Sequence, residues 1–236
     1  MRRGLVVAAC VVAAMTGAGE ARATNECRGL MVCVPVAGPW VVVPAASRRV
    51  EFQLSCPRGY IVGGLDAELT HRAIDISFPG RLGSPVNPGV TTANAAVFAG
   101  HYTGVQRQVT SFRPHIGCIP AAGGGGGAPP FAIALRSAAA FPPGRPTTRR
   151  VRTVRALADR TTRAAQGCAR NERLVGATHA VGFNTRRAPS AAVASAVSVR
   201  RTVRSGRVNV TVRGTGAIRG LNVIVQVQAI CAGTGA

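Results

Sequence analysis

The sequence predicts an all-β fold of two tandem, diverged repeats, each β-sandwich-like or barrel-like and closed by its own disulfide. The stretch CPRGYIVGG at 56–64 recurs as CARNERLVG at 168–176, 112 positions later. The distance to the next cysteine is also preserved, at 62 positions from Cys56 to Cys118 and 63 from Cys168 to Cys231. Short apolar stretches separated by Gly and Pro are typical of sandwiches and barrels.

The N-terminus has the pattern of a secretory signal peptide over residues 1–23. Two arginines precede an apolar run, and Ala-Arg-Ala at 21–23 predicts cleavage before Thr24. The run is too short to span a bilayer, which takes about 20 apolar residues. VAAC at 7–10 resembles a lipobox, but this alternative leaves a shorter apolar segment than a signal needs. We therefore expect a secreted or cell-envelope protein with no transmembrane segment.

Cleavage would leave six cysteines, an even number that in an exported chain indicates disulfides. No C-x-x-C occurs, and the spacing suits no zinc site, so we expect no metal and no cofactor. The repeated motif and spacing favour one disulfide within each repeat, with a third closing a small N-terminal loop. The expected pairs are Cys27 with Cys33, Cys56 with Cys118, and Cys168 with Cys231.

The first copy of the motif resembles a C-P-x-G-x-x-x-G-G stretch found in uncharacterised secreted β-repeat proteins of GC-rich bacteria. Cys56-Pro57-Arg58-Gly59 with Gly63-Gly64 fits this pattern, whereas the second copy departs from it at the proline and at two glycines. The resemblance implies export and β structure, and it implies no particular activity.

Two glycine positions of the motif predict local backbone geometry. Gly59 corresponds to Asn171, and both residue types adopt positive φ more readily than others, which predicts a left-handed turn after each first cysteine. Gly64 corresponds to Gly176, which predicts a strand position where a neighbouring backbone approaches closely.

Strands are expected in the first repeat at 50–54, 60–69, 95–102 and 109–118. In the second repeat, the valines of 197–212 alternate around Ser205-Gly206, which predicts a hairpin with one apolar and one arginine-rich face. Alternation over 223–228 predicts a last strand that ends at Cys231.

The predicted boundaries follow from composition. AAGGGGGAPP at 121–130 reads as a flexible linker between a first repeat with an N-terminal extension, 24–120, and a second repeat, 131–236. Aromatic residues, Trp40 among them, concentrate in the first repeat. We therefore expect a second core made mainly of Val, Ile, Leu and Ala.

The positive charge is concentrated in the second repeat. Every basic residue is Arg, and the chain carries a net charge of +21. Residues 24–120 hold eight arginines against five acids, whereas residues 131–236 hold eighteen against two, a net charge of +16. Such an excess attracts polyanions, for example an anionic envelope polymer, although a basic surface without a ligand is an alternative. Export and the shortage of aromatics for base stacking argue against sequence-specific nucleic-acid recognition.

Most candidate polyanion-binding arginines lie in 145–163. Helical spacing there would allow a basic amphipathic helix, but the matching region of the first repeat contains Pro39 and Pro44 and favours strand. The candidates are Arg149, Arg150, Arg152, Arg155, Arg160 and Arg163, with Arg200, Arg201, Arg204 and Arg207 on the hairpin.

A hydrolase, glycosidase-like, is the alternative to a non-catalytic module. Asp66 and Glu68 would share one strand face with His71 nearby, and carboxylates at i and i+2 stand roughly 7 Å apart, a separation compatible with glycoside hydrolysis. A solvated strand face neutralised by arginines explains the same pattern. Because no G-x-S-x-G, H-E-x-x-H or Walker A motif occurs, we expect a non-catalytic module.

Overall fold

The protein, described here in a computed structural model, is almost entirely β. The structure describes residues 25–30, 32–45, 49–79, 85–87, 90–91, 94–104, 109–121 and 147–233. The predicted signal peptide, its cleavage site and residues 122–130 of the predicted linker lie outside these ranges. The strands of the first half (25–121) are β1 (Val34–Ala37), β2 (Trp40–Val43), β3 (Val50–Ser55), β4 (Tyr60–Leu69), β5 (Ile74–Ser77), β6 (Pro85–Asn87), β7 (Val90–Thr91), β8 (Ala95–Tyr102) and β9 (Thr110–Pro120).

The second half (147–233) adds the remaining strands and two short helices. Its elements are β10 (Thr147–Ala156), β11 (Thr161–Gly167), β12 (Glu172–Phe183), α1 (Ala191–Ser195), β13 (Val197–Arg204), β14 (Arg207–Gly214), the 3₁₀ helix η1 (Gly216–Ile218) and β15 (Val223–Gly233). The all-β prediction is confirmed, and the described part of 145–163 consists of β10, a short connection at 157–160 and the start of β11, with no amphipathic helix.

One antiparallel seven-stranded sheet runs through both halves. β1 and β2 pair in succession with one edge of β9, and β4 pairs with its other edge. β2 also pairs with β12, at Val41–Gly182 and Trp40–Phe183, and β12 is followed by β15 and β10. The two halves are therefore joined by main-chain hydrogen bonds, a connection that the sequence did not predict.

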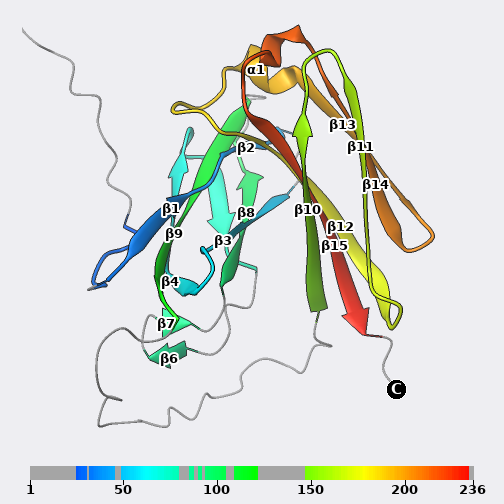
Figure 1. The fold of residues 1–236 in the computed structure, drawn as a ribbon. Coiled ribbons are helices and arrows are strands. Elements are labelled where there is room, and N and C mark those ends of the chain that lie inside the picture. Colours follow the sequence, from blue (N-terminus) through cyan, green and yellow to red (C-terminus); the bar gives the residue numbers. More distant parts are fainter. Residues whose placement is uncertain are drawn as a thin grey trace, which may run out of the picture.

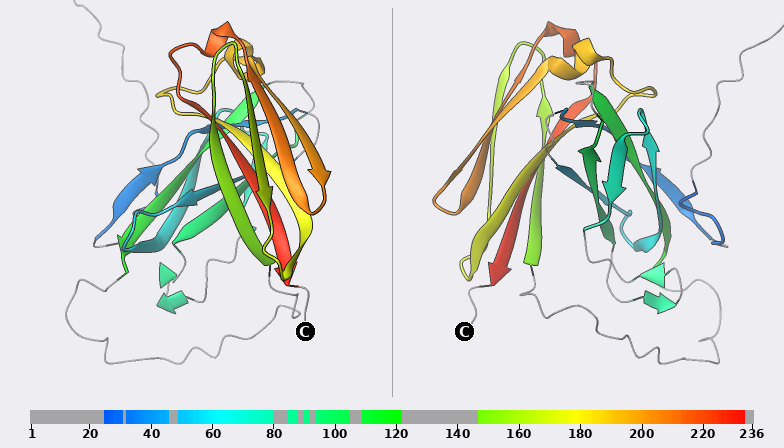
Figure 2. Two further views of the ribbon diagram at one scale, coloured as in Figure 1. Left: turned by 45° about the vertical axis from the view of Figure 1, so that its right-hand side comes forward. Right: turned by 180° about the vertical axis from the view of Figure 1, so that it is seen from behind.

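A smaller sheet covers each half of the shared one. The sheet β3–β8–β5 packs over the first half and β11–β14–β13 over the second, while β6 and β7 form a separate pair. Figures 1 and 2 show the two resulting sandwiches side by side, the first in blue to green and the second in yellow-green to red. The described sheets stay open, which favours the sandwich-like over the barrel-like alternative.

Strand order is the same in the two sandwiches. In the first, β9 lies between β4 and the β1–β2 pair; in the second, β15 lies between β12 and β10. β4 and β12 carry a register shift at the corresponding place, between Val62 and Gly64 and between Leu174 and Gly176. This correspondence agrees with a repeated unit, and its origin in an ancient tandem duplication remains a prediction.

All three disulfide pairings are confirmed. Cys56 bonds to Cys118 in the first sandwich and Cys168 to Cys231 in the second, while Cys27 and Cys33 close the N-terminal loop. In the chain-entropy model, closing a loop of about 60 residues stabilises a fold by roughly 4 kcal/mol. Each sandwich therefore has a covalent closure comparable to the net stability of a small domain.

The turns after Cys56 and Cys168 are only partly as predicted. Each is closed by one hydrogen bond, from the Tyr60 N–H to the Pro57 carbonyl and from the Glu172 N–H to the Ala169 carbonyl, both 3.1 Å. Gly59 has a φ of +84°, as expected. The expectation is wrong for Asn171, which is not among the positive-φ residues, because a type I turn needs no left-handed residue.

The strand glycines also differ. A Cβ at Gly64 would collide with the main-chain oxygen of Glu26, because the N-terminal loop lies directly on this strand. At Gly176 the nearest atom is the Cδ1 of the Ile230 side chain, at 3.0 Å. The predicted close backbone approach is therefore confirmed at Gly64 and wrong at Gly176.

Each sandwich has its own core, and Trp40 joins the one opposite to expectation. The second core contains Phe183, valines of β14 and β15, and Trp40 from β2. Strand β2 delivers the indole there because Trp40 is the residue that pairs with Phe183 on β12. The second core is otherwise aliphatic apart from Phe183, as the composition predicts.

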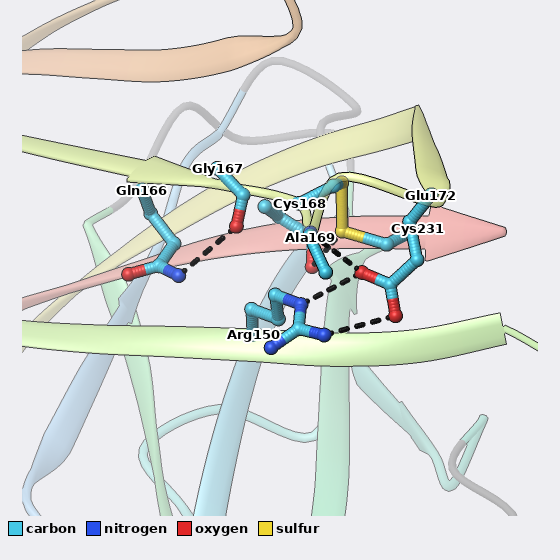
Figure 3. Close-up of a disulfide and its surroundings, with 8 residues drawn as sticks. Arg150, Gln166, Gly167, Cys168, Ala169, Glu172 and Cys231 are labelled. Carbon is cyan, nitrogen blue, oxygen red and sulfur yellow. Dashed lines mark hydrogen bonds and ion pairs between the residues drawn. A yellow bond between two sulfur atoms is a disulfide. The ribbon is translucent and has the colours of Figure 1, made fainter. Parts of the chain in front are cut away.

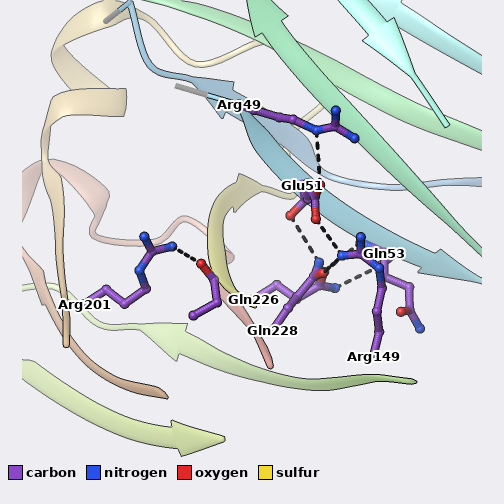
Figure 4. Close-up of polar contacts among 8 residues, drawn as sticks. Arg49, Glu51, Gln53, Arg149, Arg201, Gln226 and Gln228 are labelled. Atoms are coloured by element: carbon purple, nitrogen blue, oxygen red, sulfur yellow. Dashed lines mark hydrogen bonds and ion pairs between the residues drawn. The ribbon is translucent and has the colours of Figure 1, made fainter. Parts of the chain in front are cut away.

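A polar network joins the halves at the back of β15. Residues of β15 alternate, so Val225 and Val227 face the second core while Gln226 and Gln228 face β3. The Gln226 Oε1 accepts the Gln53 N–H at 2.7 Å, and its Nε2 donates to the Gln53 carbonyl at 2.9 Å (Figure 4). Since β3 is an edge strand, these side chains satisfy groups that a neighbouring strand would otherwise bond.

Candidate functional site

The outer face of the β11–β14–β13 sheet carries an unbalanced group of arginines. Val208, Val210 and Val212 of β14 are buried in the second core, so the alternate residues of this strand point outward. Register then places the residues opposite them on the same outer face. We call these arginines the arginine face; all are exposed, and they are Arg163, Arg200, Arg204, Arg207 and Arg213.

The arginine face has an ordered layout. One row reads Arg163, Thr211, Arg200 across the three strands, and a second reads Thr161, Arg213, Ser198. At the hairpin end Arg204 lies directly opposite Arg207, next to a turn in which Ser205 and Gly206 both have positive φ, as in a type I′ turn. The predicted hairpin with one apolar and one basic face is thus observed.

The carboxylates of the second half are paired elsewhere. The second half contains two acidic residues, Asp159 and Glu172. Asp159 forms an ion pair with the Arg219 guanidinium at 2.9 Å, and Glu172 forms an ion pair with Arg150. No ion pair in the described part of the chain reaches the arginine face. Its charges therefore face solvent in two groups, Arg204 with Arg207 at the hairpin end, and Arg163, Arg200 and Arg213 farther along the strands.

Arg149 and Arg150 are structural rather than free. The Arg149 Nη1 bonds the Glu51 Oε2 at 2.5 Å and the Gln228 Oε1 at 2.9 Å, so Arg149 belongs to the network between the halves (Figure 4). Arg150 forms a two-pronged ion pair with Glu172, Nε to Oε2 at 2.8 Å and Nη2 to Oε1 at 2.9 Å, beside the Cys168–Cys231 disulfide (Figure 3).

The Arg150–Glu172 pair also changes proton affinity. The hydrogen bonds from Arg150, followed by one from the Ala169 N–H at 2.9 Å, hold the pKa of the Glu172 carboxyl below its ordinary value. The same hydrogen bond with Glu172 raises the pKa of Arg150. Both groups therefore stay charged at neutral pH, and neither is open to a further ligand charge.

The other four predicted arginines are dispersed. Arg152 donates to the Ala165 carbonyl at 3.2 Å, Arg155 to the Asn222 side chain at 3.4 Å, and Arg201, on the inward side of β13, to the Ala177 carbonyl at 2.6 Å. Arg160 is exposed between β10 and β11. Sequence reasoning missed Arg213, although the alternation of β14 places it on the same face as Arg207.

The residues of the hydrolase alternative do not share contacts with one another. Asp66 accepts the Asn25 N–H at 2.6 Å, and the Glu68 Oε1 lies 3.5 Å from the Nε2 of His115. His71 accepts the Ala73 N–H at 3.0 Å and meets the Tyr102 ring edge-on. Among the described residues, Asp66 thus holds the N-terminal loop, Glu68 contacts His115, and His71 closes a turn.

His115 is a buried residue that sequence reasoning missed. It pairs with Asp66 across β4 and β9, and it lies between two carboxylates, 3.7 Å from Glu26 and 3.5 Å from Glu68. Glu26 and His115 are both more than nine-tenths buried, because the N-terminal loop covers this face of the first sandwich. The contacts of Asp66 with the Asn25 N–H and of His115 with Glu26 therefore anchor that loop.

One group has the spacing of metal ligands but not their chemistry. The sulfurs of Cys168 and Cys231 and a Glu172 oxygen lie within 4.8 Å of one another. The two sulfurs are joined in a disulfide, which supplies no thiolate, and both Glu172 oxygens accept hydrogen bonds. This group is a structural closure of the sandwich.

The fold and the arginine face define the class of protein: an all-β, disulfide-closed pair of sandwiches that share one sheet. No protein family, curated protein or solved structure was found to match the chain. Among the described residues, no helix is long and apolar enough to cross a membrane.

Proposed function

We propose that this chain is an exported, non-catalytic protein of the extracellular space or cell envelope that binds polyanions through the arginine face. Export is supported by the N-terminal signal pattern and by three disulfides, which persist in oxidising compartments. Polyanion binding is supported by five arginines that point outward from one sheet. Both carboxylates of the second half pair with other arginines. The partner class is an anionic envelope polymer or a similar polyanion.

The observation that carries this proposal is the placement of Arg204 directly opposite Arg207. Like charges opposite each other in an antiparallel pair destabilise it, where an unlike pair would contribute roughly 0.2–1 kcal/mol. An arrangement that costs stability on a solvent-facing strand pair fits a site whose ligand supplies the missing negative charge. Arginine is suited to this role because its planar fork binds phosphate, sulfate and carboxylate groups bidentately.

The chemistry of the face favours backbone charge over base recognition. The outward residues beside the arginines are small or hydroxylated, Thr161, Thr202, Thr211, Ser198 and Asn209 among them. Nucleic-acid modules that read bases stack them on aromatic side chains, and none of the outward residues of these three strands is aromatic. We therefore propose a polymer recognised by its repeating anionic groups.

Salt-dependent retention on immobilised heparin tests the proposal. We expect the wild type to stay bound at about 0.5 M salt, where simple Coulomb attraction is screened. The triple variant Arg200→Gln, Arg204→Gln, Arg213→Gln should elute near about 0.15 M salt. The magnitude of the slope of log K against log salt should be smaller than in the wild type by roughly 3. The matched control Arg58→Gln, Arg72→Gln, Arg186→Gln removes the same charge from exposed sites elsewhere.

Two results would overturn the proposal. Wild-type protein that elutes at about 0.15 M salt would possess only diffuse attraction. Equal shifts in the triple variant and its control would show that net charge, rather than the arginine face, determines binding.

A further inference from the structure

The second sandwich contains two adjoining hollows beside the arginine face. The larger, about 890 Å³, opens where the end of β11, the start of β12 and the β13–β14 turn meet. The smaller, about 290 Å³, follows β11 next to β14. Arg152 and Ala165 line both hollows, so the hollows adjoin at β11, and we call the two together the depression.

This depression is basic along its length. Arg173 and Arg207 line the larger hollow, Arg163 lines the smaller, and Arg152 stands between them. The single carboxylate in the lining is Glu172, and the hydrogen bonds from Arg150 and Ala169 occupy its oxygens (Figure 3). The larger hollow therefore presents unopposed guanidinium groups to any ligand that enters it.

The larger hollow also has an apolar part and more room than one anionic group needs. Val203 is 52% exposed there, and Leu174 and the Cys168 end of the disulfide contribute further apolar surface. Its volume lies in the range of pockets that hold whole small molecules, about 300–1,000 Å³. A ring-sized unit that carries an acid group would fit the space, and a bare phosphate or sulfate would leave most of it unfilled.

We propose that the two hollows form a track for successive units of an anionic glycopolymer, a polymer with acid groups on a hydroxylated, non-aromatic body. One unit would occupy the larger hollow with its acid group on Arg173 and Arg207. The acid group of the next unit would lie between Arg152 and Arg163. The inference rests on the polyanion-binding function proposed above, and it adds a defined site and a ligand class.

The residues lining the track favour this class over nucleic acid. None of the residues that line either hollow is aromatic, so a base would find no ring to stack on. Main-chain and side-chain groups of Gln166, Gly167, Asn209 and Thr211 instead offer hydrogen bonds of the kind that hydroxyl groups accept and donate.

The test compares a heparin-derived tetrasaccharide with a thymidine oligonucleotide of equal charge, each titrated by calorimetry. The track variant Arg152→Gln, Arg173→Gln should weaken tetrasaccharide binding at least about tenfold, since each lost charge-assisted hydrogen bond is worth about that factor. The matched control Arg58→Gln, Arg186→Gln removes equal charge from exposed sites elsewhere on the protein and should change tetrasaccharide binding less than about twofold. Val203→Trp narrows the larger hollow without altering charge and should weaken tetrasaccharide binding.

The outcomes separate this inference from the function on which it rests. Equal losses in the track variant and its control, no effect of Val203→Trp, or an oligonucleotide that binds as tightly as the tetrasaccharide would each overturn the track. Retention of the wild type on heparin, with its loss in the arginine-face triple variant, would then still uphold polyanion binding. A wild type that binds neither heparin nor the tetrasaccharide would overturn both.

Discussion

Gln226 forms hydrogen bonds to the main chain of Gln53 through both ends of its side-chain amide. Its Oε1 accepts the Gln53 N–H at 2.7 Å, and its Nε2 donates to the Gln53 carbonyl at 2.9 Å. The amide thereby acts as a strand residue for the free edge of β3. Gln228 extends the arrangement, because its Nε2 donates to the Glu51 carbonyl at 3.1 Å and to the Gln226 Oε1 at 2.7 Å. Where β15 meets β3, the contact between the sandwiches is consequently polar and specific.

Replacing Gln226 by Leu should destabilise the protein by about 2 kcal/mol or more. The change keeps the volume but leaves the N–H and carbonyl of Gln53 without partners, and each unsatisfied buried group costs roughly 1–3 kcal/mol. Urea unfolding of the oxidised protein measures the effect. Gln166→Leu is the control, since Gln166 donates only to the adjacent Gly167 carbonyl at 3.2 Å. A loss no larger than that of the control would contradict the assigned role of Gln226.

Trp40→Ala should destabilise the second sandwich, although Trp40 lies in the first half of the sequence. Removing a buried Trp costs roughly 3–5 kcal/mol, and this side chain packs with Phe183 and Val225. Hydrogen exchange would show the effect as faster exchange in β14 and β15. Phe52→Ala, in the first core, should instead accelerate exchange mainly in β3 and β8. The assignment of Trp40 fails if its removal affects only the first sandwich.

The sequence predicted what depends on local pattern. Residue alternation located the β13–β14 hairpin and β15, and correspondence between the two repeats located β4 and β8. The repeated spacing of Cys56–Cys118 and Cys168–Cys231 identified both long-range disulfides. These features follow from the period of a strand and from a motif written twice, so they require no knowledge of how the halves meet.

The sequence did not predict what depends on the contact between the halves. Arg149 resembled the other arginines of 145–163, yet it pairs with Glu51, which is 98 residues away in the other half. Trp40 belongs by position to the first repeat, yet the β2–β12 pairing carries it into the second core. No local pattern encodes that pairing, because alternation fixes which face a residue takes but not which strand lies beside it.

Low pH should weaken the second sandwich through Glu172. Hydrogen bonds from Arg150 and then Ala169 lower the folded-state pKa of this carboxyl, so its stabilising contribution is present above the unfolded pKa, about 4.3, and is lost as the pH falls through the depressed folded value. Glu172→Gln should therefore be less stable than the wild type near pH 6, and the difference should shrink on acidification. Unfolding curves from about pH 6 to about pH 2 measure both proteins. A difference independent of pH would refute the ion-pair explanation.

Arg204→Glu should stabilise the protein and weaken its binding to polyanions. The new carboxylate would face Arg207 directly, which replaces a repulsive pair by an attractive one and should add about 0.2–1 kcal/mol to the free energy of unfolding. The same change lowers the positive charge of the arginine face by two units, so retention on heparin should fall. Arg200→Glu is the matched control, because it alters the charge equally but lies opposite the uncharged Thr211. Thermal unfolding and heparin elution measured on all three proteins give the comparison. If Arg204→Glu is no more stable than Arg200→Glu, repulsion between Arg204 and Arg207 does not weaken the hairpin, and the main support for a ligand at this face is lost.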